Sequence, residues 1–298
     1  MLDLNHSGQT LIEEYRNDSE GLLARISANK NLTWMQMCRP VPDELIGIID
    51  QILGRRPDLY LRIFNYCGKL DVNCDILKRL PHLEKLELEV NFPGESFQPD
   101  FRVLGELDNL RALSLSAFNL KDYSFIRDVT PKLEDLHIYA DTYNGGIKFD
   151  CAWLLDFPEL HTLCLTHKAR KNIEAIAQLP KLKHLGLRSI KLPGLDFLIP
   201  LSLETFSLSW CGMNDLSSLA HLNTLCGLEL FHILKLEDIS CISELTRLEW
   251  LKLAQLKHIK TLPDLSRLKK LKKIIFWDMK IDENTLPTEI RKILSYTN

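Results

Sequence analysis

The sequence has no CxxC pair among its eight cysteines, and no cysteine in its first 37 or last 57 residues. Secreted domains use cysteines as paired or terminal disulfide staples, so this pattern indicates reduced thiols in a cytosolic protein. No apolar run approaches the roughly 18 residues of a membrane-spanning helix. The net charge is only −3, so no overall field draws the chain to nucleic acid or to an acidic membrane.

The sequence also lacks a Gly-rich phosphate loop and any paired-carboxylate arrangement. The N-terminal residues, MLDLNHSGQTLIEEYRND, lack the basic start and apolar stretch of a secretory signal, which again predicts the cytosol. We therefore expect a non-catalytic protein with no cofactor, metal or small-molecule substrate. With 298 residues, 45% of them hydrophobic, the chain can still bury a sizeable core.

One phrase, Leu-x-x-Leu-x-Leu, dominates the sequence. It recurs as LEKLEL at 83, LRALSL at 110, LEDLHI at 133, LHTLCL at 160, LKHLGL at 182, LETFSL at 203, LCGLEL at 225, LEWLKL at 248 and LKKIIF at 271. Two fainter copies, LTWMQM at 32 and DLYLRI at 58, bring the number of units to about eleven. Nine copies in phase are strong evidence for a repeat architecture.

The alternation inside the phrase predicts a strand with its leucines on one face. Between phrases the apolar residues recur at every third position, as in Leu256, Ile259, Leu262, Leu265, Leu268 and Leu271. That period matches a tight 3-10 turn. Two earlier segments, 42–56 and 74–80, are expected to be full helices.

Over residues 32–281 the chain resembles the leucine-rich-repeat family, in its short-period bacterial, internalin-like class. The resemblance implies an α/β fold, a leucine-rich-repeat solenoid or horseshoe, with a parallel concave sheet and a convex side of 3-10 and short helices. The expected organisation is an N-terminal helical cap over 1–31, the repeats over 32–281, and a C-terminal cap over 282–298.

The sequence departs from the family at the turn that follows each strand. The family places Asn three residues beyond the last leucine of the phrase. Here those positions hold Asn91, Phe118, Asp141, Lys168, Ile190, Cys211, Ile233, Leu256 and Met279. The asparagine ladder is mostly missing, so backbone groups or water must satisfy these turns.

Both ends of a solenoid need caps. The first is expected to be a helix over residues 10–27, with Thr10 and Glu13 as a capping box. The second is expected to be a short helix in LPTEIRKIL at 286–294.

Small residues are expected to form the concave floor of the middle repeats, and aromatic residues to follow toward the C-terminus. Phe231 and Trp277 occupy equivalent positions two strands apart, with Ala254 between them. Trp250 is placed nearby, with Trp210 and His232 at the neighbouring rim. These aromatic residues are candidate anchors for a protein partner. The alternative is that some of them pack under the C-terminal cap.

Charged residues add to the candidate partner-binding surface. Glu87, Glu89 and Asp135, together with Tyr139, lie in the N-terminal half of the expected face, and Lys252 lies toward the C-terminal end. Such a gradient would orient a bipolar partner. Ordinary solvated charge is the alternative.

Two further features have open interpretations. His137 and Cys164 are expected on adjacent strands, near His167 and His184, but their spacing matches no catalytic or metal motif, so a structural role is favoured. Two insertions, 91–101 and 141–150, are either recognition loops or spacers that bury phenylalanines.

The leading hypothesis is a cytosolic scaffold that binds another protein on its concave face, as an immunity protein or an adaptor. The alternatives are a secreted effector or an internalin-type adhesin, and a fragment of a ubiquitin-ligase-like enzyme. No nucleic acid or membrane partner is expected.

Overall fold

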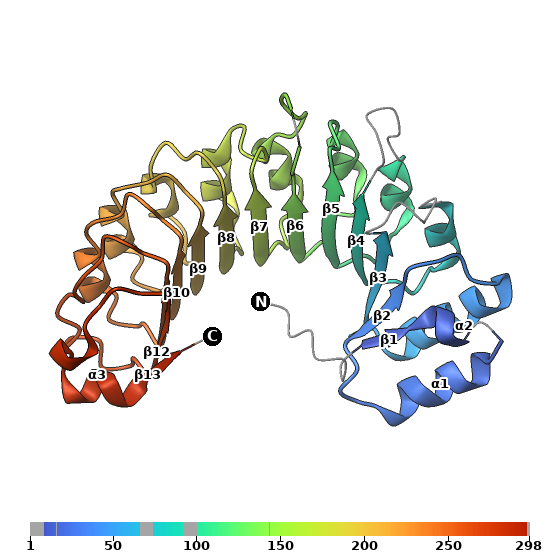
Figure 1. Ribbon diagram of the computed structural model, residues 1–298. Coiled ribbons are helices and arrows are strands. Elements are labelled where there is room, and N and C mark those ends of the chain that lie inside the picture. The colour runs from blue at the N-terminus through green and yellow to red at the C-terminus, as the bar shows by residue number, and fades with distance from the viewer. Residues whose placement is uncertain (1–8, 16, 66–73, 92–99, 143, 297–298) are drawn as a thin grey trace. The chain divides into compact units, whose positions relative to one another are not determined.

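The computed structural model describes residues 9–15, 17–65, 74–91, 100–142 and 144–296. The chain forms two compact units, unit 1 over residues 1–149 and unit 2 over residues 150–298. In each unit, parallel strands lie side by side, and a helix or 3-10 turn on the opposite face connects each strand to the next (Figure 1). This arrangement confirms the predicted repeat architecture.

Unit 1 contains six strands, and each pairs in parallel with its neighbour in sequence. They are β1 (Gln9–Leu11), β2 (Trp34–Met37), β3 (Tyr60–Asn65), β4 (Lys85–Asn91), β5 (Ala112–Phe118) and β6 (Asp135–Tyr139). The elements between them are η2 (Ile12–Tyr15), α1 (Ser19–Ala28), α2 (Asp43–Arg55), η3 (Cys74–Arg79), η4 (Phe101–Glu106) and η5 (Ser124–Asp128), where η marks a 3-10 helix.

Unit 2 contains seven strands in the same parallel order. They are β7 (Thr162–Thr166), β8 (His184–Arg188), β9 (Thr205–Ser209), β10 (Gly227–Phe231), β11 (Trp250–Ala254), β12 (Lys273–Trp277) and β13 (Leu294–Tyr296). The convex side carries η6 (Cys151–Asp156), η7 (Ile173–Gln178), η8 (Asp196–Leu198), η9 (Ser217–His221), η10 (Ser240–Glu244), η11 (Glu283–Thr285) and α3 (Thr288–Ile293).

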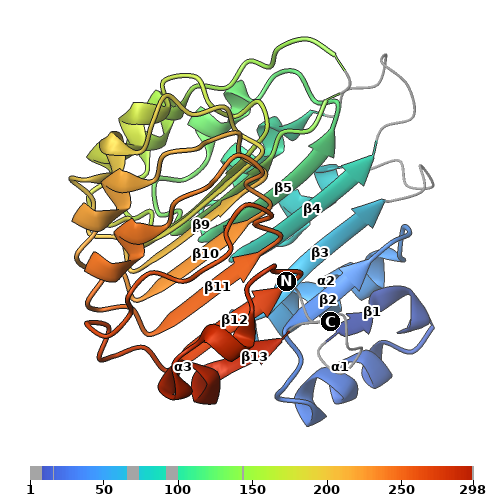
Figure 2. The same ribbon diagram turned by 60° about the vertical axis from the view of Figure 1, so that its left-hand side comes forward.

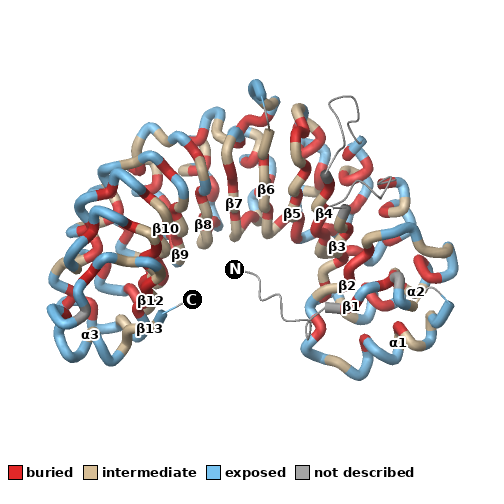
Figure 3. Tube along the Cα trace, in the orientation of Figure 1, coloured by how far each residue is buried: buried red, intermediate tan, exposed pale blue. Residues whose placement is uncertain are grey.

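The core of each unit lies between the sheet and the convex layer (Figure 3). Alternate strand residues are buried, as Leu185 and Leu187 in β8 and Leu251 and Leu253 in β11 illustrate. The eleven phrases correspond one by one to strands β2 to β12. The period-two pattern therefore located the strands, while β1 and β13 lie outside the phrases and were not predicted.

The convex layer follows the period of three in most repeats. Segment 42–56 forms the α-helix α2, as predicted, but Cys74–Arg79 is a 3-10 helix, so the prediction of a full helix at 74–80 was wrong. The turn between β11 and β12 forms no regular 3-10 helix. Proline 263 stands where η10 begins in the preceding repeat, and it has no backbone N–H for such a turn.

The N-terminal capping prediction was wrong in its details. Thr10 lies in β1 and is buried, and the helix begins only at Ser19. Asp18 is the capping residue, because its Oδ1 accepts a hydrogen bond of 2.8 Å from the N–H of Gly21. The side chain of Glu13 lies outside the described residues. The apolar face of this region still covers the first repeat, since Ile12, Leu22 and Ile26 are buried.

At the other end, the closing helix forms as predicted, as α3, and β13 then adds one more strand to the sheet. The cap limits of 1–31 and 282–298 remain a prediction. Among the described residues, no helix combines the length and the apolar character needed to cross a bilayer.

The second insertion, 141–150, is tied to the preceding turn. Lys148 forms a bridge with Asp122, through both the backbone and an ion pair of 3.0 Å. Phe149 is 2% exposed and packs edge-on against Tyr123, with ring centres 6.1 Å apart. These contacts favour the spacer interpretation for this insertion. Most of the first insertion, residues 92–99, lies outside the described residues.

Leu185 tests the strand register. It is 2% exposed in β8, so Leu185→Ala should lower the free energy of unfolding by about 2–5 kcal/mol, through lost burial and a residual cavity. Leu155→Ala, at a side chain that is 39% exposed on the convex side, is the control and should cost only about 0.5 kcal/mol. Urea denaturation of both variants measures the difference, and equal losses would contradict the register.

Candidate functional site

The parallel register places side chains of the concave face in columns across the strands. In unit 2, the last outward position of each strand forms one column (Figure 2). From β7 to β12 it contains Thr166, Arg188, Ser209, Phe231, Ala254 and Trp277. Small residues therefore alternate with large ones along the column, so each large ring has room to lie over a small neighbour.

Four residues of unit 2 form the aromatic cluster: Trp210, Phe231, His232 and Trp277. Phe231 and Trp277 stack with ring centres 5.2 Å apart and an interplanar angle of 24°. They can meet across two strands because Ala254, which lies between them in the register, is small and fully buried. Trp210 stacks on His232 at 3.8 Å and meets the ring of Phe231 edge-on at 5.5 Å.

The backbone positions the outer half of this cluster. Trp210 and His232 directly follow β9 and β10 and have left-handed φ values of 58° and 53°. The N–H of Trp210 donates to the carbonyl of Phe231 at 2.9 Å, and the N–H of His232 donates to the carbonyl of Ala254 at the same distance. His232 Nδ1 also forms a hydrogen bond of 2.8 Å with Gln255 Oε1. The two rings are thus fixed at the rim of the sheet.

Burial separates the members of the cluster. Trp210 is 42% exposed, whereas Phe231, His232 and Trp277 are half-buried. An exposed tryptophan that is held by a stacked neighbour presents apolar surface with little freedom left to lose. Such residues are typical anchors of protein interfaces.

Trp250 does not belong to this cluster, which corrects the sequence-based grouping around Phe231 and Trp250. It begins β11, four residues before Ala254, and therefore lies about 13 Å along the strand from the Phe231–Trp277 stack. Its ring covers Gly227 of β10, where a Cβ atom would come within 2.2 Å of the indole. Glycine is needed at 227 because the tryptophan occupies the space of a side chain.

The predicted positive charge of Lys252 is neutralised within unit 2. Its Nζ lies 2.6 Å from Glu229 Oε1 on the adjacent strand, and Ser207 donates to the other carboxylate oxygen at 3.0 Å. The middle of the face is therefore a closed polar network. The exposed cations of this face are Arg188, whose guanidinium lies 6.0 Å from the ring of Trp210, and Lys273.

The acidic residues predicted in unit 1 are neutralised in a similar way. Arg62 of β3 forms an ion pair of 2.9 Å with Glu87, and a second ion pair with Glu89. Burial raises the pKa of Glu87, while Arg62 lowers it. These two glutamates are thus structural partners of Arg62, which weakens the case for them as acidic contacts. Asp135 begins β6 and is half-buried. A charge gradient along the whole chain remains a prediction.

The faint first repeats carry concave residues that the sequence analysis missed. Trp34 and Tyr60 stack with ring centres 4.5 Å apart, and Lys85 Nζ lies 5.5 Å from the ring of Tyr60. Burial, with a further contribution from Asp135, raises the pKa of Tyr60 to about 12. The same outward positions in LTWMQM and DLYLRI would have identified Trp34 and Tyr60, and Arg188 stands at an equivalent position in LKHLGL.

The histidine and cysteine residues show no reactive arrangement. Burial lowers the pKa of His137, against an opposing contribution from Asp135. His137 meets Tyr139 edge-on at 6.5 Å, and His184 Nδ1 forms a hydrogen bond of 2.8 Å with Thr205. Cys164 faces Gly186. No group of three or more His, Cys, Asp or Glu side chains among the described residues is arranged to hold a metal ion.

Other cysteines are buried structural residues. Seven cysteines lie within the described ranges, and all seven are free thiols. Burial raises the pKa of Cys74 and of Cys151 to about 12, with smaller contributions from nearby carboxylates. Cys211 is buried in the missing asparagine column, and its Sγ lies 3.3 Å from the carbonyl of Ser209. These environments favour inert thiols.

No protein-family model matches the sequence, and no curated protein matches it either. Solved structures do match. An internalin, InlF, of Listeria monocytogenes superposes with a TM-score of 0.52 at 18% identity, over 90% of this chain and 81% of the other. A leucine-rich-repeat protein of Leptospira interrogans gives a TM-score of 0.58 at 22% identity, over 90% and 67%. The chain has the leucine-rich-repeat fold.

A second internalin of Listeria monocytogenes, internalin C2, gives a TM-score of 0.50 at 20% identity, over 69% of this chain and 84% of the other. At these identities the likeness concerns the fold and carries no partner or activity across. The function must therefore be argued from the residues of the leucine-rich-repeat face.

Gly227→Ala tests the placement of Trp250. The added Cβ would meet the indole at 2.2 Å, so we expect the ring to turn toward solvent and acrylamide quenching of tryptophan fluorescence to increase. Because the ring can move, the loss in unfolding free energy should stay below about 3 kcal/mol. Gly212→Ala is the matched control, since nothing lies within 4 Å of its Cβ position. An unchanged quenching constant in Gly227→Ala would show that the ring lies elsewhere.

His137 should make the stability of the chain depend on pH. Its folded-state pKa lies below the ordinary value of about 6.5, so the unfolded chain binds the proton more readily. Stability should therefore fall as the pH drops from about 6.5 through the folded-state pKa. His137→Phe should reduce this dependence in melting curves between pH 7.5 and 5. If the variant kept the full dependence, another histidine would be responsible.

Proposed function

We propose that this chain is a non-catalytic scaffold that binds another protein on its concave face, through the aromatic cluster of unit 2. The observation that carries the proposal is Trp210, which is 42% exposed and yet held in place by its stack on His232. Ordered aromatic surface beside small residues is the usual composition of an interface centre.

The floor beside the cluster supports this proposal. Gly186, Ser207 and Ser209 leave a low surface next to the rings. The Glu229–Lys252 ion pair already satisfies its own charges, so a partner can cover it without leaving an unpaired charge. A convex protein surface fits such a floor better than a small substrate does, and no metal or nucleophile arrangement points to catalysis.

The biological role within this class is a further proposal. Seven free thiols are consistent with the cytosol, and a rigid binding face suits an immunity or adaptor protein with one tight partner. The alternative is a secreted effector or a surface adhesin, which the internalins among the matched structures favour. Fractionation of the native host cells with an antibody against the chain distinguishes these locations.

Alanine variants of the aromatic residues test the binding face. Trp210→Ala and Phe231→Ala should each weaken partner binding by about 2 kcal/mol or more, because each removes apolar contact area at the interface centre. Trp250→Ala tests whether the opposite end of the strands also takes part. Partners are first captured from native lysate with the wild-type chain and with the triple variant, and single affinities are then measured by calorimetry.

Ile199→Ala is the matched control, because Ile199 is 41% exposed on the convex side. It should leave the affinity unchanged. If all three aromatic variants bound the captured partner like the wild type, the interface would lie elsewhere and the proposal would be wrong.

A further inference from the structure

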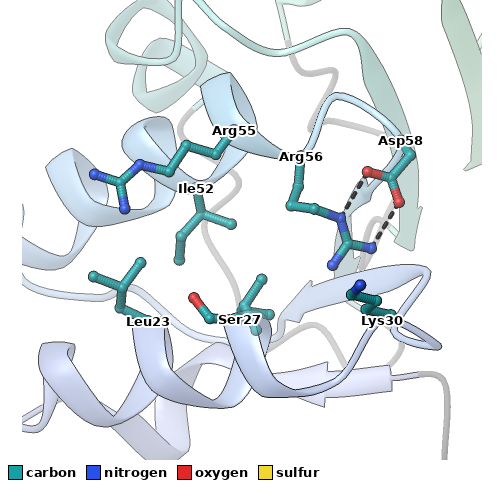
Figure 4. Close-up of a pocket in the computed structure, with 8 residues that line it drawn as sticks. Leu23, Ser27, Lys30, Ile52, Arg55, Arg56 and Asp58 are labelled. Carbon is teal, nitrogen blue, oxygen red and sulfur yellow. Dashed lines mark hydrogen bonds and ion pairs between the residues drawn. The ribbon is translucent and has the colours of Figure 1, made fainter.

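A pocket of about 390 Å³ lies in unit 1 between α1 and α2, far in the sequence from the aromatic cluster (Figure 4). Its apolar surface comes from Leu23 and Ile26 of α1 and from Ile52 of α2. Ile26 and Ile52 are buried, and Leu23 is half-buried. Protein interiors are normally packed to crystal density, so the space between two neighbouring helices is unusual. Its volume falls in the lower range of small-molecule sites, roughly 300–1,000 Å³.

The rim of the pocket is positively charged. Arg56 is already satisfied, because it pairs with both carboxylate oxygens of Asp58 at 2.7 Å and donates to the carbonyl of Leu32 at 3.0 Å. Lys30 and Arg55 are exposed, and neither forms an ion pair within the part of the chain that the structure describes. The rim therefore carries two cations beyond the closed Arg56–Asp58 pair.

Helix ends explain part of this charge. Arg55 is the last residue of α2, and Lys30 follows the end of α1 by two residues, so both cations stabilise negative helix termini. That effect accounts for the sign of the charge. It does not account for an unfilled apolar space beside the charge.

We propose that this pocket binds a free amphiphilic anion, a carboxylate at the end of an unbranched alkyl chain. The chain lies against Leu23, Ile26 and Ile52, where each buried methylene contributes about 0.8 kcal/mol. The carboxylate lies at the rim, beside a cation. In Figure 4, Arg55 and Lys30 flank the pocket on opposite sides, so one head group meets one of them. The site is separate from the proposed protein interface.

Titration calorimetry with dodecanoate, below its micelle concentration, tests the proposal on the full chain. Dodecanol and dodecyltrimethylammonium have the same alkyl chain with no charge or with a positive charge. We expect dodecanoate to bind one to one and at least about tenfold tighter than dodecanol, and the cation to bind least. Comparable binding of all three compounds would show an adventitious apolar surface and would overturn the proposal.

Variants locate the site. Either Lys30→Gln or Arg55→Gln should weaken dodecanoate binding at least about fivefold, and Ser27→Trp, at an exposed pocket-lining position, should abolish it by filling the space. Lys257→Gln, at an exposed lysine of unit 2, should change nothing. If the glutamine variants only lower the melting temperature and leave the affinity unchanged, the cations serve the helix ends and the proposal is wrong.

A membrane is the other source of the same ligand chemistry. Vesicles of phosphatidylglycerol are therefore tested beside free dodecanoate by flotation. Binding of dodecanoate without flotation supports a free ligand. Flotation without dodecanoate binding would place the anion in a bilayer surface and would overturn the proposal of a free ligand.

Discussion

The turn at the end of each strand of unit 2 determines what the concave face presents. From β7 to β12, the residue directly after every strand has a left-handed φ, between 48° and 58°, and none of these residues is glycine. Such a conformation costs about 1–3 kcal/mol for a residue with a side chain. It persists because the N–H of that residue bonds to the carbonyl that ends the next strand, as Ser189 does to Ser209 at 2.8 Å.

This backbone bond replaces the amide ladder that the family sequence pattern leads one to expect. The chain turns inward immediately afterwards, and the asparagine position becomes a buried apolar column in which Ile190, Cys211, Ile233 and Leu256 are at most 2% exposed. The same turn points the preceding side chain outward at the rim. Trp210 and His232 occupy that outward position, so the loss of the asparagine ladder and the aromatic rim have one structural cause.

The strands could be predicted because a period of two, repeated in phase, reports directly which residues face the core. The first cap could not be predicted in this way. Thr10 and Glu13 satisfy a local capping pattern, but β1 extends the sheet through Thr10, and tertiary pairing outweighs a local signal. The missing 3-10 helix before β12 depends on one proline within an otherwise regular period, which periodicity alone does not weigh.

For the candidate site, the identity of the face could be predicted but its interactions could not. Each phrase was considered as one strand, whereas the decisive contacts join neighbouring strands at the same register. Lys252 looks like a free cation within LEWLKL, and only its alignment with Glu229 in LCGLEL shows the ion pair. The same alignment moves Trp250 away from Phe231 and places it over Gly227.

These pairings change what the face can recognise. Because Glu229 neutralises Lys252 and Arg62 is paired with Glu87 and Glu89, long-range steering of a charged partner has few charges to act on. Recognition by unit 2 must then depend on shape and on apolar contact at Trp210, with Arg188 as the nearby cation that can meet a partner's carboxylate. A neutral floor beside a rigid aromatic rim discriminates by fit, since a partner that leaves the rim uncovered gains almost nothing from charge.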